Sequence, residues 1–243
     1  MNTPAVASLA AAGLVAGWWL RAVIVRYAVP AGEPPHSRCP ACARQLLSAR
    51  RLALAPSGRC PSCRQRIGPP PLSVEVTAAA LLGALAARVH PALVLAAACW
   101  LALCAVPLTF IDVAVRRLPD LLTIPAWAGT AFLLMLAAAV SGHWYDLARA
   151  GLGGLALAGF YLALALISPA GMGLGDVKAA ASIGTLLAWA GWRVLIAGGC
   201  AGFLLAAIYA TAALATRRAT RKQHIPFAPF MLTGAFAILL LTT

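Results

Sequence analysis

Long apolar stretches constrain this chain more than any other feature of its sequence. A helix needs about 20 predominantly apolar residues to cross a bilayer, and eight stretches approach that length. They lie at residues 5–25, 72–90, 91–111, 121–140, 147–167, 177–192, 194–215 and 225–241. Because 62% of the 243 residues are hydrophobic and only 10% are charged, a water-soluble core cannot account for them. We therefore predict an all-α polytopic membrane protein with about eight transmembrane helices in a lipid bilayer.

The 19 Lys and Arg residues are distributed unevenly between these stretches. If residues 26–71 are cytoplasmic, fifteen of them lie on the cytoplasmic side: Arg26, Arg38, Arg44, Arg50, Arg51, Arg59, Arg64, Arg66, Arg116, Arg117, Lys178, Arg217, Arg218, Arg221 and Lys222. Only Arg88, Arg149 and Arg193 then lie on the other side. The positive-inside rule therefore places both termini outside the cytoplasm. Topology explains the net charge of +13 without nucleic-acid binding, so we predict no nucleic-acid partner.

The first apolar stretch is predicted to be a retained span. Its first 20 residues contain no Lys or Arg, whereas a cleaved signal peptide begins with a positively charged region. Cleavage would also place the following loop outside the cytoplasm, against the charge distribution.

That loop carries four of the seven cysteines as two C-x2-C pairs, CPAC at 39–42 and CPSC at 60–63. This spacing is typical of a tetrahedral zinc site, in which each pair presents two thiolates to one ion. Two disulfides are the alternative, but a cytoplasmic loop is kept reducing. We therefore predict a structural zinc bound by Cys39, Cys42, Cys60 and Cys63, whose binding would stabilise a loop that has little core of its own.

The acidic residues are few, six in all. Asp120 and Asp146 open apolar stretches and are predicted to be helix N-caps. Asp112 instead ends the third stretch, where the helix dipole disfavours a carboxylate, and Asp176 begins the sixth. Two simpler interpretations stay open: Asp112 could pair with Arg116 four residues later, and Asp176 could be an N-cap. However, the predicted topology puts Asp112 and Asp176 on the same side of the membrane, where two carboxylates would suit an acid/base pair sharing one proton.

Four sequence motifs, in order, resemble those of one family. GWWLRAVIVRY at 17–27 is similar to its opening motif, and FIDVAVRRLPDLLTIP at 110–125 is similar to its first aspartate motif. GMGLGDVKAAASIG at 171–184 resembles its GxGD motif, and IPFAPF at 225–230 resembles its closing motif. The four-cysteine loop also stands at the expected place. The chain thus resembles the prepilin peptidases, which are type IV leader peptidases among the GxGD-type membrane aspartyl proteases.

The resemblance implies a function and a set of site residues. Asp112 and Asp176 would be the catalytic pair, and Gly173 and Gly175 would form the GxGD turn. The glycines could let a substrate backbone approach the pair, although a plain turn between helices would also use glycine. The substrates would be type IV pilin-like precursors, whose leader peptide is cut at the cytoplasmic boundary of the bacterial inner membrane.

Many relatives also N-methylate the new terminus with S-adenosylmethionine, and Glu75 is the candidate residue for that site. Here the sequence departs from the family pattern. The surrounding text, PPPLSVEVTAAA, lacks the arginine and tyrosine of relatives, and Ala79 stands where they have glycine. Arg21 stands where they tend to have asparagine. The sequence therefore predicts a peptidase with weak or absent methylation.

Three segments follow from these arguments: a first transmembrane helix at 1–25, a cytoplasmic zinc module at 26–71 and a seven-helix protease domain at 72–243. Two other kinds of protein would also place carboxylates or a metal module at a membrane. A proton-coupled transporter would show internal repeats and acids at the membrane midplane, and a non-catalytic scaffold would use the zinc module for binding alone.

Overall fold

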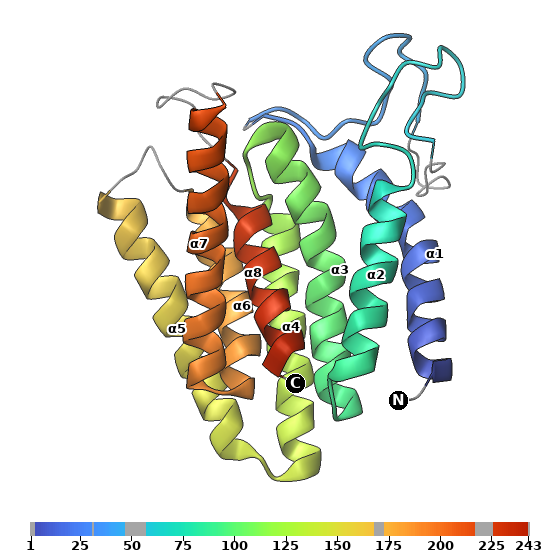
Figure 1. The fold of residues 1–243 in the computed structure, drawn as a ribbon. Coiled ribbons are helices and arrows are strands. Elements are labelled where there is room, and N and C mark those ends of the chain that lie inside the picture. The colour runs from blue at the N-terminus through green and yellow to red at the C-terminus, as the bar shows by residue number, and fades with distance from the viewer. Residues whose placement is uncertain (1–2, 31, 47–56, 168–172, 217–225, 243) are drawn as a thin grey trace. The chain divides into compact units, whose positions relative to one another are not determined.

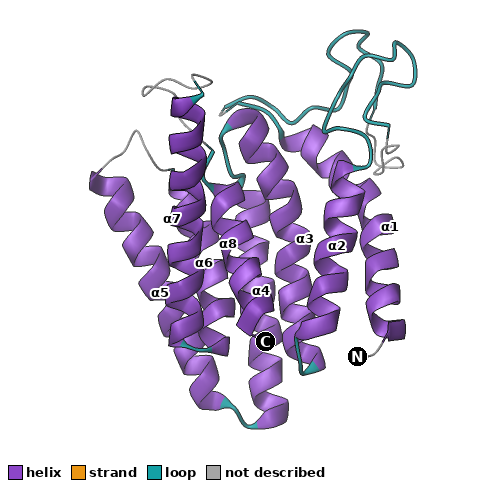
Figure 2. Cartoon of the chain, viewed as in Figure 1, coloured by secondary structure: helices purple, strands orange, loops and turns teal. Residues whose placement is uncertain are grey.

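The computed structural model describes residues 3–30, 32–46, 57–167, 173–216 and 226–242 (Figure 1). Within these ranges the secondary structure elements are all helices, and two isolated β-bridges lie in the cysteine loop (Figure 2). The helices are α1 (Thr3–Tyr27), α2 (Ser73–Arg88), α3 (Ala92–Val115), α4 (Asp120–Ser141), α5 (Trp144–Ile167), α6 (Leu174–Ala190), α7 (Trp192–Ala215) and α8 (Ala228–Thr242). Each of the eight predicted stretches corresponds to one of these helices.

Five of these helices are long and apolar enough to cross a membrane: α1, α3, α4, α5 and α7. The shortest of them, α4, has 22 residues, which at 1.5 Å per residue gives about 33 Å, enough for a hydrocarbon core of about 30 Å. The helices α2, α6 and α8 have 16, 17 and 15 residues. The prediction of an all-helical membrane protein is therefore confirmed, and five of its eight predicted spans meet the length criterion.

The chain divides into two compact units. The first contains residues 1–88 and 102–117, and the second contains residues 89–101 and 118–243. The helix α3 contributes to both, because its first ten residues belong to the second unit and the remainder belongs to the first.

In the first unit, α1 and α2 pack along a line of small residues. A Cβ atom added at Gly13 would lie 2.7 Å from Ala79 Cα, and one added at Gly17 would lie 2.7 Å from Glu75 Cα. Glycines four residues apart lie on one face of a helix and let two backbones approach closely in a membrane. The methyl group of Ala79 is thus accommodated by a glycine on the opposite helix.

The second unit uses the same kind of contact. A Cβ atom at Gly184 of α6 would lie 2.6 Å from the carbonyl oxygen of Gly153 in α5. The helices α7 and α8 lie side by side (Figure 1), and a Cβ atom at Gly234 would lie 2.5 Å from the nitrogen of Gly202. Since lipid supplies no hydrophobic drive between helices, this close packing is what holds such helices together.

The predicted N-cap roles of Asp120 and Asp146 were wrong. The N-cap of α4 is Pro119, and Asp120 is the first helical residue, whose Oδ1 lies 2.7 Å from Lys178 Nζ. Asp146 is the third residue of α5, and its Oδ1 lies 2.9 Å from Arg149 Nη2. Both carboxylates stay in a first helical turn, which the helix dipole favours, but each is bound to a cation.

Candidate active site and metal centre

The four predicted metal ligands converge. All four Sγ atoms of Cys39, Cys42, Cys60 and Cys63 lie within 4.8 Å of one another, and the Cys39–Cys63 and Cys42–Cys60 sulfurs are each 3.7 Å apart. Sulfurs bound at about 2.3 Å to a tetrahedral zinc ion lie about 3.8 Å apart. None of the seven cysteines forms a disulfide. The geometry is therefore that of a metal-binding cluster.

Two equivalent turns build this cluster. In the first, Cys39 N–H donates to the Arg44 carbonyl at 2.8 Å and Ala43 has a φ of 54°. In the second, Cys60 N–H donates to the Gln65 carbonyl at 2.8 Å and Arg64 has a φ of 58°. This left-handed residue just after each C-x2-C pair turns the backbone back, so that both sulfurs of a pair face the same point.

The thiols compete for negative charge. Backbone N–H groups of Cys63 and then Ser62 hydrogen-bond to the Cys60 sulfur and lower the pKa of that thiol to about 6. The Gln65 N–H also lowers the pKa of the Cys63 thiol, but desolvation and the neighbouring thiols outweigh it. Together they raise the pKa of Cys63 to about 12. A divalent cation would relieve this competition, because thiolates are the metal-binding form.

The cysteine module packs on α1. Cys39, Cys60 and Leu46 form a buried cluster with Ala22 of α1, and Ile67 packs against it. Residues 31 and 47–56 of the predicted module lie outside the described residues. The apolar contact means that the metal centre is joined to the first helix by packing as well as by the chain.

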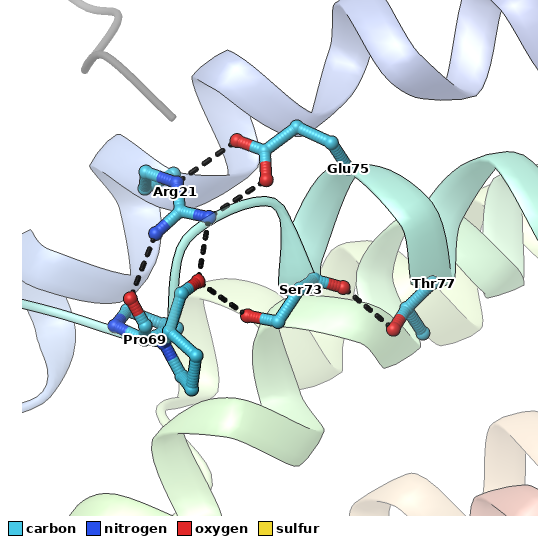
Figure 3. Close-up of polar contacts among 6 residues, drawn as sticks. Arg21, Pro69, Ser73, Glu75 and Thr77 are labelled. Carbon is cyan, nitrogen blue, oxygen red and sulfur yellow. Dashed lines mark hydrogen bonds and ion pairs between the residues drawn. The ribbon is translucent and has the colours of Figure 1, made fainter. Parts of the chain in front are cut away.

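Glu75 lies in the first turn of α2 and is 1% exposed. Both of its oxygens accept from Arg21 of α1: Nε to Oε1 at 2.9 Å and Nη2 to Oε2 at 2.7 Å (Figure 3). The same guanidinium donates to the carbonyls of Pro69 and Pro70 at 2.9 and 3.1 Å. Arg21 is itself fully buried, so it links α1, α2 and the last residues of the cysteine module.

In the sequence, Arg21 stands out only as a departure from a motif, and its pairing with Glu75 is not predicted. The signal was present, because a charged residue inside an apolar stretch must find a counter-ion. Glu75 is the one acid of the adjacent apolar stretch. The pairing joins residues 54 positions apart, so local sequence patterns alone do not reveal it.

Asp112 lies in the last turn of α3, in the first unit, and is 4% exposed. The Arg116 N–H donates to its backbone carbonyl at 2.8 Å, and Arg116 then leaves the helix with a φ of 54°. Asp112 therefore lies at the end of α3, a few residues before the loop that follows this helix.

A cavity of about 380 Å³ lies within the first unit beside this helix end. Its lining includes Ile24, Val25, Ala28, Leu46, Ile67, Phe110, Val113 and Ala114, with His36, Arg38 and Arg66 as its titratable or cationic side chains. Phe110 and Val113 flank Asp112 in sequence. The cavity is thus mostly apolar, has a cationic part and adjoins the turn that carries this carboxylate.

Asp176 lies in the second unit as the third residue of α6 and is 7% exposed. It is not the N-cap, which is Gly173. Its Oδ2 accepts from the Gly173 N–H at 3.2 Å, and its own N–H donates to the Gly173 carbonyl at 3.1 Å. The carboxylate is therefore oriented by the start of its own helix. Gly171 and Met172, which begin the GxGD motif, lie outside the described residues.

The two glycines of the GxGD turn differ in their surroundings. A Cβ atom at Gly175 would lie 2.8 Å from Leu118 Cβ, so this glycine is needed for the packing of the chain itself. Among the described residues, a Cβ atom at Gly173 would meet no atom closer than 3.8 Å, and its backbone is extended, with φ −88° and ψ 156°. Of the two glycines, only Gly173 therefore has open space beside its backbone within the described part of the chain.

These features define a multi-pass helical membrane protein with a four-cysteine module and two buried aspartates, and comparison with known sequences identifies its family. The sequence model of the type IV leader peptidase family matches residues 95–240, and that of the bacterial peptidase A24 N-terminal domain matches residues 11–89. Both buried aspartates fall within the first match. No solved structure matches the chain.

Curated relatives agree with this assignment. A protein of Aeromonas salmonicida is 32% identical over 216 residues, covering 85% of this chain and 71% of the relative. A protein of Bacillus subtilis is 32% identical over 206 residues, covering 83% and 79%. Both are named prepilin leader peptidase/N-methyltransferase. The chain belongs to the type IV leader peptidase family, which makes it a peptidase and a multi-pass protein of the bacterial inner membrane.

Proposed function

We propose that this peptidase uses Asp112 and Asp176 as its catalytic pair to remove the leader peptide of type IV pilin-like precursors. The observation that carries the proposal is the burial of both carboxylates, at 4% and 7% exposed, within the residues matched by the peptidase family. In a chain with six acids, two buried carboxylates at helix ends are costly unless they have a function. The family assignment favours this activity over a proton-coupled transporter or a non-catalytic scaffold.

The chemistry follows from two carboxyl groups in different protonation states. One carboxylate takes a proton from a water molecule, which attacks the scissile carbonyl carbon. The other, protonated, gives its proton to the carbonyl oxygen and takes one back when the C–N bond breaks, while the first passes the proton it took from water to the leaving amine. Such a pair titrates as a unit, so either aspartate can begin as the base. The open space beside Gly173 supports its role as the place where an extended substrate backbone approaches.

The names of the relatives support precursors of type IV pilins as substrates. We assign the cavity beside Asp112 to the substrate residues next to the cleaved bond. Its apolar lining suits the first residues of an apolar helix, and the side chains of His36, Arg38 and Arg66 suit an acidic group nearby.

The proposed orientation places both termini outside the cytoplasm and the aspartates on the cytoplasmic side. It requires α2, α6 and α8 to cross the membrane in addition to the five longer helices. Short helices can do so because the bilayer thins locally and flanking side chains extend to the membrane surface. The positive charge of the predicted inner segments supports it. Six of those basic residues lie outside the described residues: Arg50, Arg51, Arg217, Arg218, Arg221 and Lys222.

For the four-cysteine cluster we propose a structural zinc ion. Cys39, Cys42, Cys60 and Cys63 would fill all four positions of a tetrahedral ion and leave none for water. Bound there, the ion would hold the cytoplasmic module at 26–71 together, between the first helix at 1–25 and the protease domain at 72–243.

S-adenosylmethionine does not fit at Glu75. Both carboxylate oxygens are engaged by Arg21, and the side chains of the pair are 1% and 2% exposed. A cationic cofactor would have to displace a guanidinium that makes four hydrogen bonds. We therefore propose that this chain methylates its product weakly or not at all.

The catalytic proposal is tested by single substitutions in the full chain, assayed for cleavage of a type IV pilin precursor in bilayer nanodiscs. Asp112→Asn and Asp176→Asn should each abolish cleavage, because an amide can neither take a proton from the attacking water nor give one to the substrate. Asp120→Asn is the matched control, since its side chain is 60% exposed and bound to Lys178, and it should keep substantial activity. Full activity in Asp112→Asn would refute the pair, and loss of activity in Asp120→Asn alone would move the active site.

A further inference from the structure

Tyr161 of α5 carries a buried hydroxyl group for which the fold provides no use. Its side chain is completely buried, and its Oη has no hydrogen-bond partner among the described residues. Leaving a buried hydroxyl unsatisfied destabilises the fold, and phenylalanine would fill the same space without that cost. Packing alone therefore does not explain why this position has a hydroxyl group.

The ring of Tyr161 is held by aromatic contacts from other helices. Its centroid lies 5.4 Å from that of Phe203 in α7 and 5.8 Å from that of Phe227, just before α8. Phe203 and Phe227 contact each other at 5.0 Å. Three rings at such distances restrict one another's orientation, so the phenol oxygen has a fixed position.

The packing of α5 against α6 places Tyr161 near the beginning of α6, which carries Asp176. The two helices are antiparallel: Arg149 donates to the Ala188 carbonyl, Gly154 lies against Thr185 and Ala181, and Leu157 lies against Gly184. One turn beyond Leu157, Tyr161 comes level with the first turns of α6. Asp176 lies in the first of these turns.

We propose that Tyr161 is a positioning residue for the peptidase reaction, whose hydroxyl donates a hydrogen bond to the ionised carboxylate of Asp176, directly or through one water molecule. The inference rests on the proposed catalytic role of Asp176. A phenol O–H in a water-poor site stabilises a carboxylate more strongly than it would in water, and it would fix which oxygen faces the substrate.

Other titratable or charged groups near this contact do not replace the phenol. Lys178 of α6 is bound to Asp120 of α4 at 2.7 Å, so its charge is already compensated. Cys200 of α7 is exposed, and a thiol is only a weak hydrogen-bond donor. The phenol is therefore the strongest neutral donor near Asp176 among these groups.

The test is Tyr161→Phe in the full chain, with kcat and KM for pilin-precursor cleavage measured across pH in nanodiscs. The ring and its contacts remain, so the melting temperature should stay the same or rise slightly. We expect kcat to fall about tenfold or more, with KM changed less than twofold. A hydrogen bond from the phenol favours the charged carboxylate, so its loss should move the acid limb of the kcat profile to higher pH.

Tyr209→Phe is the matched control, because Tyr209 also stacks on a phenylalanine, at 5.1 Å from Phe230, but is 52% exposed. It should keep the wild-type profile. Unchanged kcat and pH dependence in Tyr161→Phe, with Asp176→Asn inactive, would overturn the inference and leave the catalytic pair intact. A fall in kcat matched by a lower melting temperature, without a shift of the acid limb, would also overturn it. Activity in Asp176→Asn would instead refute the proposed function.

Discussion

At the residue scale, three buried acids have different surroundings. Glu75, Asp112 and Asp176 are all less than 10% exposed, so burial alone does not separate a structural acid from a reactive one. Glu75 faces a guanidinium on both oxygens, a geometry that holds a carboxylate firmly in its charged form. Asp176 accepts a backbone N–H from Gly173 on one oxygen, and this donor is neutral.

This difference leads to a prediction for Glu75→Gln. Removing one partner of a buried ion pair leaves the other charge uncompensated, at a cost of about 3–5 kcal/mol. We expect a large fall in thermal stability, with loss of activity only in proportion to unfolded protein. Mass spectrometry should find the wild-type product without an added methyl group, and the variant's product should have the same mass.

Glu33→Gln is the control, because Glu33 is exposed and should tolerate the change. A methylated wild-type product whose methyl group disappears in Glu75→Gln, with cleavage intact, would show that Glu75 serves methyl transfer despite its ion pair with Arg21.

At the element scale, the cysteine module depends on two short turns and a small apolar cluster. Its described core consists of Cys39, Leu46 and Cys60 against Ala22, with Ile67 beside it. So few buried side chains cannot offset the chain entropy of a loop of this length. We therefore expect the module to depend on the proposed ion for its stability, whereas the helices are held by close backbone packing.

Elemental analysis of the purified protein should accordingly find about one zinc ion per chain. Replacing Cys39 and Cys60 together by Ser should remove it, since each pair loses one of its two thiolates. We expect the melting temperature to fall, while the kcat of the protein that stays folded changes little, because the ion has no open position for substrate. Cys200→Ser, at an exposed position in α7, should leave the zinc content unchanged. Disulfides at these cysteines in the cell would contradict both the metal and the cytoplasmic location.

At the scale of the whole molecule, the apolar pattern of the sequence was enough to predict every helix, but not every contact between helices. The sequence predicted helix ends to within a few residues where a local residue type ends the helix. For example, α6 ends at Gly191, which has a φ of 140°. Apart from Asp146, which pairs with a residue three positions away, the errors arose where distant residues decide the outcome. Asp120 binds Lys178, 58 positions away, and Glu75 binds Arg21, 54 positions away. Tyr161 was missed because its importance depends on the register between α5 and α6.

The number of membrane crossings can be decided by the positions of the two ends. Eight crossings place residues 1 and 243 on the same side of the membrane, whereas the five longer helices alone would place them on opposite sides. Basic segments favour the cytoplasmic side, so we predict that both ends lie outside the cytoplasm. Alkaline phosphatase fused to either end should be active in a bacterial host, and green fluorescent protein exported by the same route should not fluoresce.

As a control, a reporter inserted near Gly32, in the exposed part of the cysteine module, should give the opposite result. A phosphatase signal at one end and fluorescence at the other would require an odd number of crossings and would refute the eight-span topology.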